Sequence, residues 1–365
     1  MRCMNVNDAN RKILRIAVDC RMIADSGIGC YLKSILNYFV QYNEISFLLI
    51  GDKVKLQAYA LNGNCEFLET RVPIFSIQEA FHFPVEEINK CDCFYSPNYN
   101  IPLGIKIPIF STIHDVVFLD VPIVSHIKRW GYYLYLQQAI SRSRLIFTVS
   151  DFSKKRILHH FLRVPEIIVT HNGVAEHILN VNKMAPYFDF PYFLYVGNIK
   201  PHKGLKILLE AYQSIESRVG DKKLVIVGNM DNFKTGDTYI QSLIEKGVLG
   251  KNIIFTGRVS DEELIRIMRY ALLLVQPSVY EGFGIPPLES MHLGTPVLLS
   301  DIPVFKEIYK DFPVQYFRCG DVDDLTVKLQ NQSFERITLS EDLKDRYSYR
   351  RSAEIILYNI QKYLS

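Results

Sequence analysis

The sequence has no uncharged apolar run of the roughly 18–20 residues that a membrane-spanning helix requires. Its opening stretch, MRCMNVNDANRK, is polar and lacks the apolar core of a secretory signal peptide. We therefore expect a cytoplasmic protein. A peripheral contact with the inner face of the plasma membrane stays open.

Charge and cysteine pattern each argue against a class of site. The formal net charge is only +3 at pH 7, which gives no case for nucleic-acid binding. The cysteines show none of the paired spacings of a zinc site, and Cys91 and Cys93 are too close for the usual C-x2-C arrangement. The seven cysteines stand at positions 3, 20, 30, 65, 91, 93 and 319. We expect free thiols in a reducing compartment.

Length and composition indicate a globular protein of two domains. A chain of 365 residues is longer than one ordinary hydrophobic core can serve. The composition is 48% hydrophobic and 22% charged, which is that of a folded chain and not of a disordered one. The sequence also lacks a fixed-period repeat and low-complexity tracts.

Short apolar runs alternate with amphipathic stretches along the whole chain. The runs are continuous and rich in Val, Ile, Leu and Phe, as in parallel strands covered on both faces. Stretches such as 204–219 and 261–271 have a helical period and separate the runs. This alternation predicts an α/β fold with two doubly wound parallel-sheet (Rossmann-like) domains facing a cleft. Strands are expected at 14–20, 45–51, 107–115, 145–151, 192–198, 223–229, 252–258, 272–278 and 296–301.

The break between the two halves is expected at NVNKMAPYFDFP (180–191), which has two prolines and no helical period. We place a first domain at 1–182 and a second at 183–342. The final stretch, 343–365, is expected to form a helix that docks across the domains.

In open α/β sheets, ligands bind beyond the carboxyl ends of the strands. His114 occupies such a place at the end of the expected strand 107–115, and Lys203 closes the loop after strand 192–198. Glu281 follows strand 272–278 in the same way. We therefore expect elements of both domains to meet at one ligand cleft.

Two loops suit a phosphate group. Gly27 and Gly29 precede a helix, where glycine lets the backbone approach a ligand and free N–H groups attract an anion. Lys203 stands just before Gly204 at another helix start, where a cation also favours phosphate. The alternatives are a plain strand-to-helix turn and a solvated surface lysine.

The stretch YEGFGIPPLES (280–290) holds two glutamates and no other charge. Pro286 suits the first turn of a helix that should stop at Gly294. Glu281 then lies in the loop before this helix and Glu289 lies on it, so the two carboxylates come from different elements. A glycosidase pair is one interpretation, but it gives the phosphate features no role. Hydroxyl groups of a nucleotide sugar fit better.

Asp321 and Asp323 have the spacing of a metal-bound aspartate pair. Because they follow an apolar run and start a helical stretch, we interpret them as a helix cap and a first-turn charge instead. No metal site is expected.

With these residues in view, nearly the whole chain resembles the family 4 retaining glycosyltransferases of GT-B fold. The similarity rests on six ordered motifs: SGIGCY, YSPNYNIPL, TIHDVVF, FTVSDFSKKRI with THNGV, VGNIKPHKGL and EGFGIPPLE. In wording the chain is most similar to mannosyltransferase members.

The resemblance implies three catalytic residues, His114, Lys203 and Glu281. His114 would lie beside the donor sugar, although a satisfied loop histidine is the alternative. Lys203 would neutralise the donor diphosphate, and Glu281 would contact hydroxyls of the donor sugar.

The resemblance also implies a donor-binding set. Glu289 would hold the ribose, backbone N–H groups near Phe283 and Gly284 would line the pocket, and Arg258 with Val259 would lie near the base. The full set is Gly27, Gly29, Gly197, Asn198, Lys203, Arg258, Val259, Glu281, Gly282, Phe283, Gly284, Ile285 and Glu289.

Members of this family transfer a sugar by front-face attack, without a protein nucleophile, a cofactor or a metal. The resemblance thus implies a nucleotide-sugar donor, GDP-mannose first, with UDP- or dTDP-linked sugars as alternatives. The acceptor would be a glycan or lipid-linked glycan in surface polysaccharide synthesis. Catalysis would depend on positioning and on electrostatic stabilisation of the leaving diphosphate.

Two positions depart from the family pattern. Asn198 and Cys30 stand where the family often has arginine. Either Lys200 or His202 compensates for Asn198, or the donor binds more weakly.

Two alternative functions remain, and one segment has two interpretations. A nucleotide-sugar epimerase or sugar-phosphate synthase has the same fold and would differ in whether it consumes a separate acceptor. A sugar-binding protein without catalysis would ignore nucleotides. The stretch 125–144 joins basic residues to Trp130 and three tyrosines, which suits either an interfacial membrane patch or an ordinary packed helix.

Overall fold

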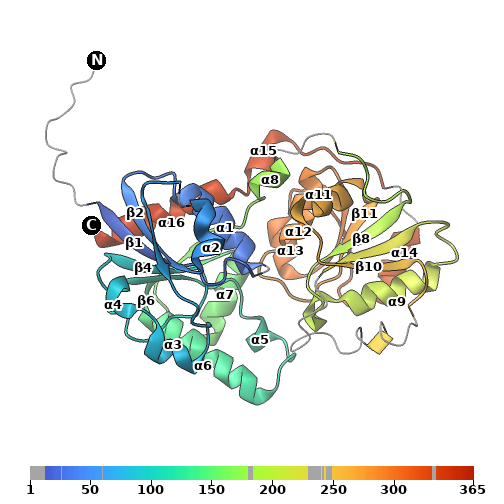
Figure 1. The fold of residues 1–365 in the computed structure, drawn as a ribbon. Coiled ribbons are helices and arrows are strands. Elements are labelled where there is room, and N and C mark those ends of the chain that lie inside the picture. Colours follow the sequence, from blue (N-terminus) through green and yellow to red (C-terminus); the bar gives the residue numbers. More distant parts are fainter. Residues whose placement is uncertain are drawn as a thin grey trace.

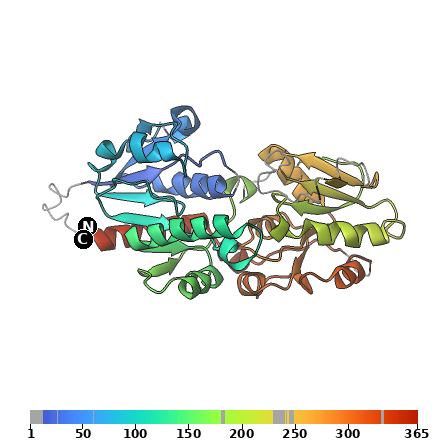
Figure 2. The same ribbon diagram turned by 90° about the horizontal axis from the view of Figure 1, so that it is seen from below.

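The computed structural model describes residues 13–25, 27–59, 61–179, 184–228, 240, 242–243, 249–330 and 334–365. Within these residues the strands form two parallel sheets, and helices cover each sheet. The two resulting domains lie side by side (Figures 1 and 2). The prediction of two doubly wound parallel-sheet domains is confirmed. The predicted boundary between 182 and 183 lies outside the described residues.

The first sheet has the order β3-β2-β1-β4-β5-β6-β7. Its strands are β1 (Leu14–Asp19), β2 (Ile45–Gly51), β3 (Cys65–Glu69), β4 (Cys93–Ser96), β5 (Ile109–Thr112), β6 (Ser143–Thr148) and β7 (Ile167–Val169). Its helices are α1 (Ile28–Phe39), α2 (Lys53–Leu56), α3 (Ile77–His82), α4 (Val85–Ile88), α5 (Val117–Asp120), α6 (His126–Arg142) and α7 (Asp151–His160), with α8 (Glu176–Leu179) following β7.

The second sheet has the order β10-β9-β8-β11-β12-β13. Its strands are β8 (Tyr192–Val196), β9 (Lys223–Val227), β10 (Ile253–Gly257), β11 (Leu273–Gln276), β12 (Val297–Ser300) and β13 (Gln315–Phe317). Its helices are α9 (Leu205–Ile215), α11 (Asp261–Tyr270), α12 (Ile285–His292), α13 (Pro303–Ile308) and α14 (Val322–Gln330). All nine predicted strands are present; β2 has the predicted bounds and the other eight have shifted ends.

The last segment of the chain returns to the first domain. It forms α15 (Glu341–Asp345) and α16 (Tyr349–Leu364). Apolar side chains of α16, including Tyr349 and Ile356, share a core with Leu32 and Phe39 of α1. In Figures 1 and 2, α16 runs along the first domain and its end lies far from the second sheet.

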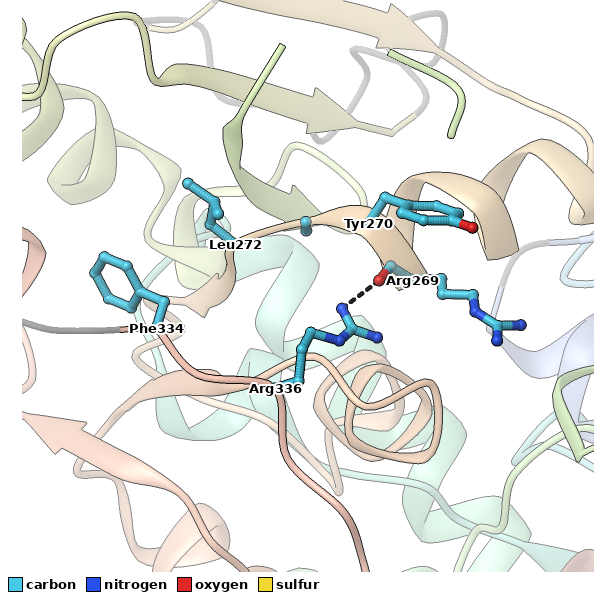
Figure 3. Close-up of a pocket in the computed structure, with 6 residues that line it drawn as sticks. Arg269, Tyr270, Leu272, Phe334 and Arg336 are labelled. Atoms are coloured by element: carbon cyan, nitrogen blue, oxygen red, sulfur yellow. Dashed lines mark hydrogen bonds between the residues drawn. The ribbon is translucent and has the colours of Figure 1, made fainter. Parts of the chain in front are cut away.

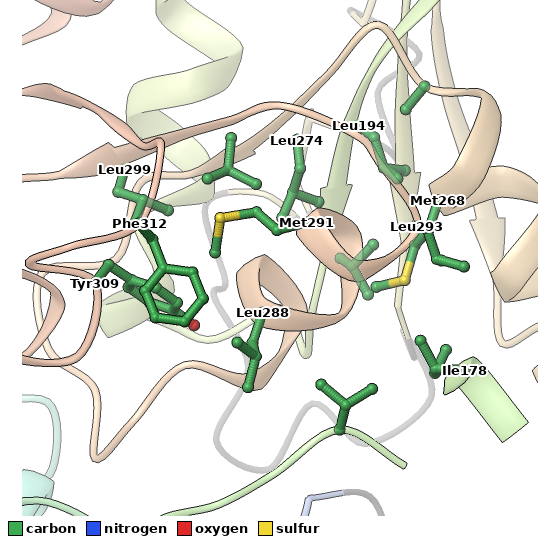
Figure 4. Close-up of a cluster of buried hydrophobic side chains, with 14 of the residues drawn as sticks. Ile178, Leu194, Met268, Leu274, Leu288, Met291, Leu293, Leu299, Tyr309 and Phe312 are labelled. Carbon is green, nitrogen blue, oxygen red and sulfur yellow. The ribbon is translucent and has the colours of Figure 1, made fainter. Parts of the chain in front are cut away.

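A hydrophobic core fixes α12, the helix that carries Glu289. Leu288 and Met291 of this helix are buried against Leu274 of β11 and Tyr309 (Figure 4). Burying a side chain such as Leu288 contributes roughly 1.5–3 kcal/mol. The position of Glu289 is therefore set by a packed core and not by a loop.

The strand order places two switch points in the molecule. In the first sheet, β2 and β3 extend to one side of β1, and β4 and the later strands extend to the other side. In the second sheet, β9 and β10 lie on one side of β8, and β11 to β13 lie on the other. The strand order therefore reverses direction at β1 and at β8. Such points open a crevice at the carboxyl ends of the strands. The loops after β8 and β11 thus meet at one of them.

Two further properties concern the described residues as a group. None of their helices has the length and apolar character needed to cross a membrane. The predicted free thiols are confirmed for all cysteines except Cys3, which lies outside the described part of the chain.

Candidate functional site

The loop after β8 brings Lys203 to the second switch point. The loop ends in a 3-10 turn, η2 (Pro201–Lys203), and Gly204 caps α9 with φ 69°, in the left-handed region. A Cβ on Gly204 would overlap the backbone carbonyl of Pro277, which follows β11. The two loops thus lie in direct contact. Glycine is required at position 204 because of its left-handed φ and because a Cβ would not fit. The predicted helix start after Lys203 is confirmed.

Lys203 and Glu281 form an ion pair across these loops. Lys203 Nζ lies 2.6 Å from Glu281 Oε2, and Ser278 Oγ donates to Oε1 at 2.8 Å. Gln276 in turn donates from Nε2 to Ser278 Oγ at 3.1 Å. The carboxylate of Glu281, a residue only 8% exposed, is thereby held in one orientation.

Glu289 lies on α12 with its carboxylate available. Pro286 stands in the first turn, as predicted, and the helix ends at His292, two residues before Gly294. In the described residues the Glu289 side chain has no hydrogen bond or ion pair. Although it keeps contact with solvent, burial raises its pKa to about 7, and the carboxylate of Asp261 adds to this. The thiol of Cys30, on α1 of the first domain, lies within electrostatic reach.

His114 approaches from the first domain as a neutral imidazole. Its Nε2 lies 2.9 Å from the carbonyl oxygen of Pro97, and its ring meets that of Tyr31 edge-on at 4.7 Å. Burial lowers the pKa of His114. Since a carbonyl can only accept, Nε2 carries the proton and Nδ1 is left as an acceptor.

Gly282 joins the two domains beside His114. A Cβ on Gly282 would lie 2.7 Å from the carbonyl oxygen of His114. The Gly282 carbonyl accepts from Ser150 Oγ at 2.6 Å, and the His114 carbonyl accepts from Ser153 Oγ at 2.9 Å. The backbone contact between Gly282 and the His114 carbonyl thus brings His114 of the first domain close to Glu281 of the second.

Sequence reasoning missed two other contacts between the domains. Tyr280 Oη donates to Asp120 Oδ2 at 2.8 Å. Burial alone would raise the pKa of Asp120, but hydrogen bonds from Arg156, His160 and Tyr280 hold it below its usual range. These side chains lie far apart in the sequence, and no local pattern marks them.

The second missed contact caps a helix. The carboxylate of Glu307, on α13, accepts from the backbone N–H of Asp151 at 2.8 Å and of Phe152 at 2.7 Å. These groups open α7 of the first domain, where an anion also complements the helix dipole. The Ser-Asp-Phe-Ser start of α7 was a recognisable cap signal, but its partner was not.

The first-domain glycines differ in role. At Gly29 a Cβ would lie 2.7 Å from the carbonyl oxygen of Met22, so packing within the protein already requires glycine there. Gly27 caps α1 and faces open space. A ligand could therefore approach the backbone at Gly27, whereas at Gly29 the protein itself fills the space.

Other predicted donor residues surround the Lys203–Glu281 pair at varying distance. Gly197 and Asn198 lie on the same loop as Lys203, and Ile285 opens α12. The Phe283 ring is buried against Tyr347, and the Gly284 carbonyl accepts from Tyr309, so only backbone N–H groups of this turn can face a ligand.

Arg258 and Val259 come from another strand of the same sheet. They follow β10, an edge strand separated from β8 by β9. Arg258 is exposed and Val259 packs partly against the core. Their contact with a nucleotide base stays a prediction.

The aspartate pair is a helix cap, as predicted. Asp321 Oδ1 accepts from the backbone N–H of Asp324 at 2.9 Å, and Arg318 pairs with Asp321. Across the part of the chain that the structure describes, no three His, Cys, Asp or Glu side chains are grouped to hold a metal ion.

Two hollows in the described surface lie away from this cluster. One, of about 410 Å³, is lined by Tyr270, Phe334 and Arg336 at the amino end of β11, the opposite end from Glu281 (Figure 3). Of the two arginines that line it, Arg336 already donates to the backbone carbonyls of Arg269 and Leu293. The other, of about 610 Å³, lies along α6.

Three comparisons bear on this geometry. Residues 180–330 match the family model described as "Glycosyl transferases group 1". That segment contains Lys203, Glu281 and Glu289.

Two curated relatives are O-antigen mannosyltransferases. The chain is 29% identical over 266 residues to O-antigen chain mannosyltransferase B of Escherichia coli, and the match covers 68% of each chain. It is 31% identical over 205 residues to O-antigen chain mannosyltransferase RfbU of Salmonella typhimurium, covering 54% of this chain and 53% of that one.

Among solved structures, the chain is similar to Anabaena Alr3699/HepE in complex with UDP and glucose. The TM-score is 0.73 at 16% identity, and the superposition covers 96% of this chain and 100% of that one. At this identity the likeness establishes the fold, which is the two-domain GT-B architecture.

Proposed function

We propose that this chain is a group 1 glycosyltransferase, the family whose model residues 180–330 match. It transfers a hexose from a nucleotide-diphosphate sugar to a glycan or lipid-linked glycan, retaining the anomeric configuration. The supporting observation is the convergence of Lys203 and Glu281 at a switch point, beside His114 of the other domain. This arrangement joins a cation for phosphate to acceptors for sugar hydroxyls.

The proposed reaction is the front-face transfer that the family resemblance implies. The bond from the anomeric carbon to the β-phosphate oxygen breaks, and its electron pair stays on that oxygen. The acceptor hydroxyl bonds to the anomeric carbon from the same face, and its proton passes to the departing phosphate oxygen. Lys203 stabilises the negative charge that the diphosphate gains as it leaves. Such electrostatic stabilisation of the transition state is usually the largest single contribution to catalysis.

Two carboxylates orient the donor. Glu281, fixed by Ser278 and Lys203, accepts from hydroxyls of the hexose. Glu289 has no protein partner among the described residues and accepts from the ribose. His114 presents Nδ1 to the sugar as an acceptor. No metal ion or cofactor takes part.

The donor is GDP-mannose and the product belongs to a surface polysaccharide. This proposal draws on the names of the relatives, both O-antigen chain mannosyltransferases. The reaction takes place on the cytoplasmic side of the membrane.

Thermal unfolding with single ligands tests the proposal. The purified protein is melted with GDP, UDP, ADP, dTDP and free hexoses, each with and without EDTA. A ligand at about a hundred times its Kd stabilises by roughly 2.7 kcal/mol, a shift of several degrees in Tm. We expect a shift with GDP that EDTA leaves unchanged. A shift with free hexose and with no nucleotide contradicts the proposal and favours a sugar-binding protein.

Consumption of an acceptor separates the transferase from its same-fold rivals. An epimerase converts its nucleotide sugar in the absence of any acceptor, and a sugar-phosphate synthase requires a sugar phosphate. The proposed enzyme turns over only with a glycan acceptor.

We also propose that α6 contacts an anionic bilayer. Ile127 and Trp130 are 84% and 65% exposed and line the 610 Å³ hollow with Leu119. Arg129, which also lines it, and the neighbouring Lys128 supply positive charge. Apolar side chains among cations suit an interfacial surface on anionic lipid.

Flotation with vesicles tests this contact. Lys128→Glu with Arg129→Glu is expected to reduce binding to phosphatidylglycerol vesicles and to leave the weak binding to phosphatidylcholine vesicles unchanged. Equal binding of variant and wild type to the anionic vesicles eliminates α6 as the contact.

A further inference from the structure

The loop between β8 and α9 carries two lysines with different surroundings. Lys203 is paired with Glu281 at 2.6 Å. Lys200 is half-buried, yet its ammonium has no hydrogen bond and no ion pair anywhere in the ranges that the structure describes. A half-buried ammonium without a hydrogen bond or ion pair loses part of its hydration without a direct contact to replace it.

The charges around Lys200 come from three elements. Burial lowers the pKa of Lys200, and the cation of Lys203 lowers it further. The carboxylates of Asp115, in the first domain, and of Glu281 act in the opposite direction but do not reverse the shift. Without a ligand, this site therefore holds two ammonium groups that repel each other. An anion bound between them would relieve the repulsion.

His202, between the two lysines, does not share this property. Its side chain is buried, and its Nδ1 is closed off from solvent without a hydrogen-bond partner among the described residues. Burial and the two neighbouring cations lower its pKa to about 3. His202 is thus neutral at pH 7 and faces the interior, where a ligand cannot reach it.

We infer that Lys200 binds the donor diphosphate together with Lys203 and supplies the second positive charge of that site. The inference rests on the proposed function and deepens it. It also decides between the two residues that the sequence left open: Lys200 compensates for the uncharged amide of Asn198, and His202 does not. Because Asp115 lies near Lys200, the diphosphate site adjoins the contact between the domains.

The test compares nucleoside diphosphates with monophosphates. Affinities of GDP, UDP, ADP and dTDP and of the matching monophosphates are measured by calorimetry for the wild type and for Lys200→Gln. The matched control is Lys206→Gln, a lysine exposed on α9 that pairs with Glu210. We expect Lys200→Gln to weaken the diphosphate at least about tenfold and to leave the monophosphate nearly unchanged.

Two further measurements, the Tm of Lys200→Gln and the ligand preference of Lys200→Arg, exclude a folding defect. Without ligand, Lys200→Gln is expected to have a Tm equal to or above that of the wild type, because the repulsion from Lys203 is gone. Lys200→Arg, which keeps the charge, is expected to retain the preference for diphosphate.

The outcomes separate the two proposals. If the wild type binds a diphosphate and Lys200→Gln keeps the full preference for it, the role of Lys200 is wrong and the proposed function stands. If the wild type binds no nucleotide of the panel, the proposed function fails, and the inference fails with it.

Discussion

Lys203 and Glu281 hold each other in place in the absence of ligand, so a substitution of either affects both binding and stability. Lys203→Gln removes the cation and leaves the Glu281 carboxylate with Ser278 as its remaining partner. We expect a loss of transfer rate of about 100–1,000-fold, the usual size for a lost electrostatic contact to a leaving group. The free energy of unfolding should fall by about 1–3 kcal/mol.

Transfer assays and urea unfolding of the same preparation measure the two effects. Lys206→Gln, on α9 just after the loop, is the control and should match the wild type in both. A Lys203→Gln enzyme with wild-type turnover would remove Lys203 from the reaction.

Glu289 makes both stability and ligand binding depend on pH. Its pKa is raised from 4.5 to about 7 in the folded protein, so the folded state binds more protons than the unfolded state between these values. The free energy of unfolding therefore falls as the pH rises from about 4.5 to about 7. Allowing for the solvent contact of this side chain, we expect a loss of about 1–2 kcal/mol.

Nucleotide binding should change in the opposite direction. The ionised carboxylate is the better acceptor for ribose hydroxyls, so affinity should increase as the pH rises through about 7. Glu289→Gln should flatten both profiles. Urea unfolding and nucleotide titration between pH 5 and pH 8 measure them, and an unchanged pH slope in the variant assigns the effect to another group.

At the scale of the element, the loop after β8 is held in place by one glycine. Gly204→Ala introduces a Cβ that overlaps the Pro277 carbonyl and a residue that disfavours φ 69°. We expect this change to separate the loops, destabilise the protein by about 1–3 kcal/mol and weaken nucleotide binding. Gly63→Ala, which meets nothing within 4 Å, is the control. Equal Tm values for the two variants contradict the close approach.

The strands that the sequence predicted are mostly buried on both faces, with the edge strand β10 as the exception, because a continuous apolar run is visible without knowledge of the neighbours. The missed strands lack that signal. β3, CEFLE, is an edge strand whose short apolar run is interrupted by Glu66 and Glu69; β7 and β13 are edge strands of three residues. β4 is central but has only four residues. Edge position thus accounts for β3, β7 and β13, whereas β4 is as long as β5, β11 and β12, which were predicted.

The site was predictable to the extent that topology determines it. Lys203 and Glu281 follow neighbouring strands at a switch point, so their proximity follows from the fold. The ion pair itself, the Ser278 hydrogen bond and the Glu307 cap depend on side-chain geometry between distant segments. One sequence without structure carries no signal for these.

At the scale of the whole molecule, Glu307 ties the second domain to the start of α7. Glu307→Ala leaves two helix N–H groups without their acceptor, a loss of about 1 kcal/mol. We expect a more variable arrangement of the domains, seen as a larger radius of gyration in X-ray scattering without ligand. A saturating nucleotide should restore the wild-type value.

The control for this change is Glu341→Ala, on the exposed start of α15, whose carboxylate pairs only with Lys344 among the described residues. It should scatter like the wild type. An unchanged radius in both variants shows that the remaining contacts, those of Gly282 and Tyr280, suffice to hold the domains.

The return of α16 to the first domain has a consequence for synthesis. Between the end of β7 and Tyr349 the ribosome must add about 180 residues, which takes roughly 10–40 s. During that interval the second sheet can already fold, whereas the face of α1 that α16 covers stays open to water. The nascent chain therefore displays an apolar surface for seconds, which is the kind of surface that chaperones bind.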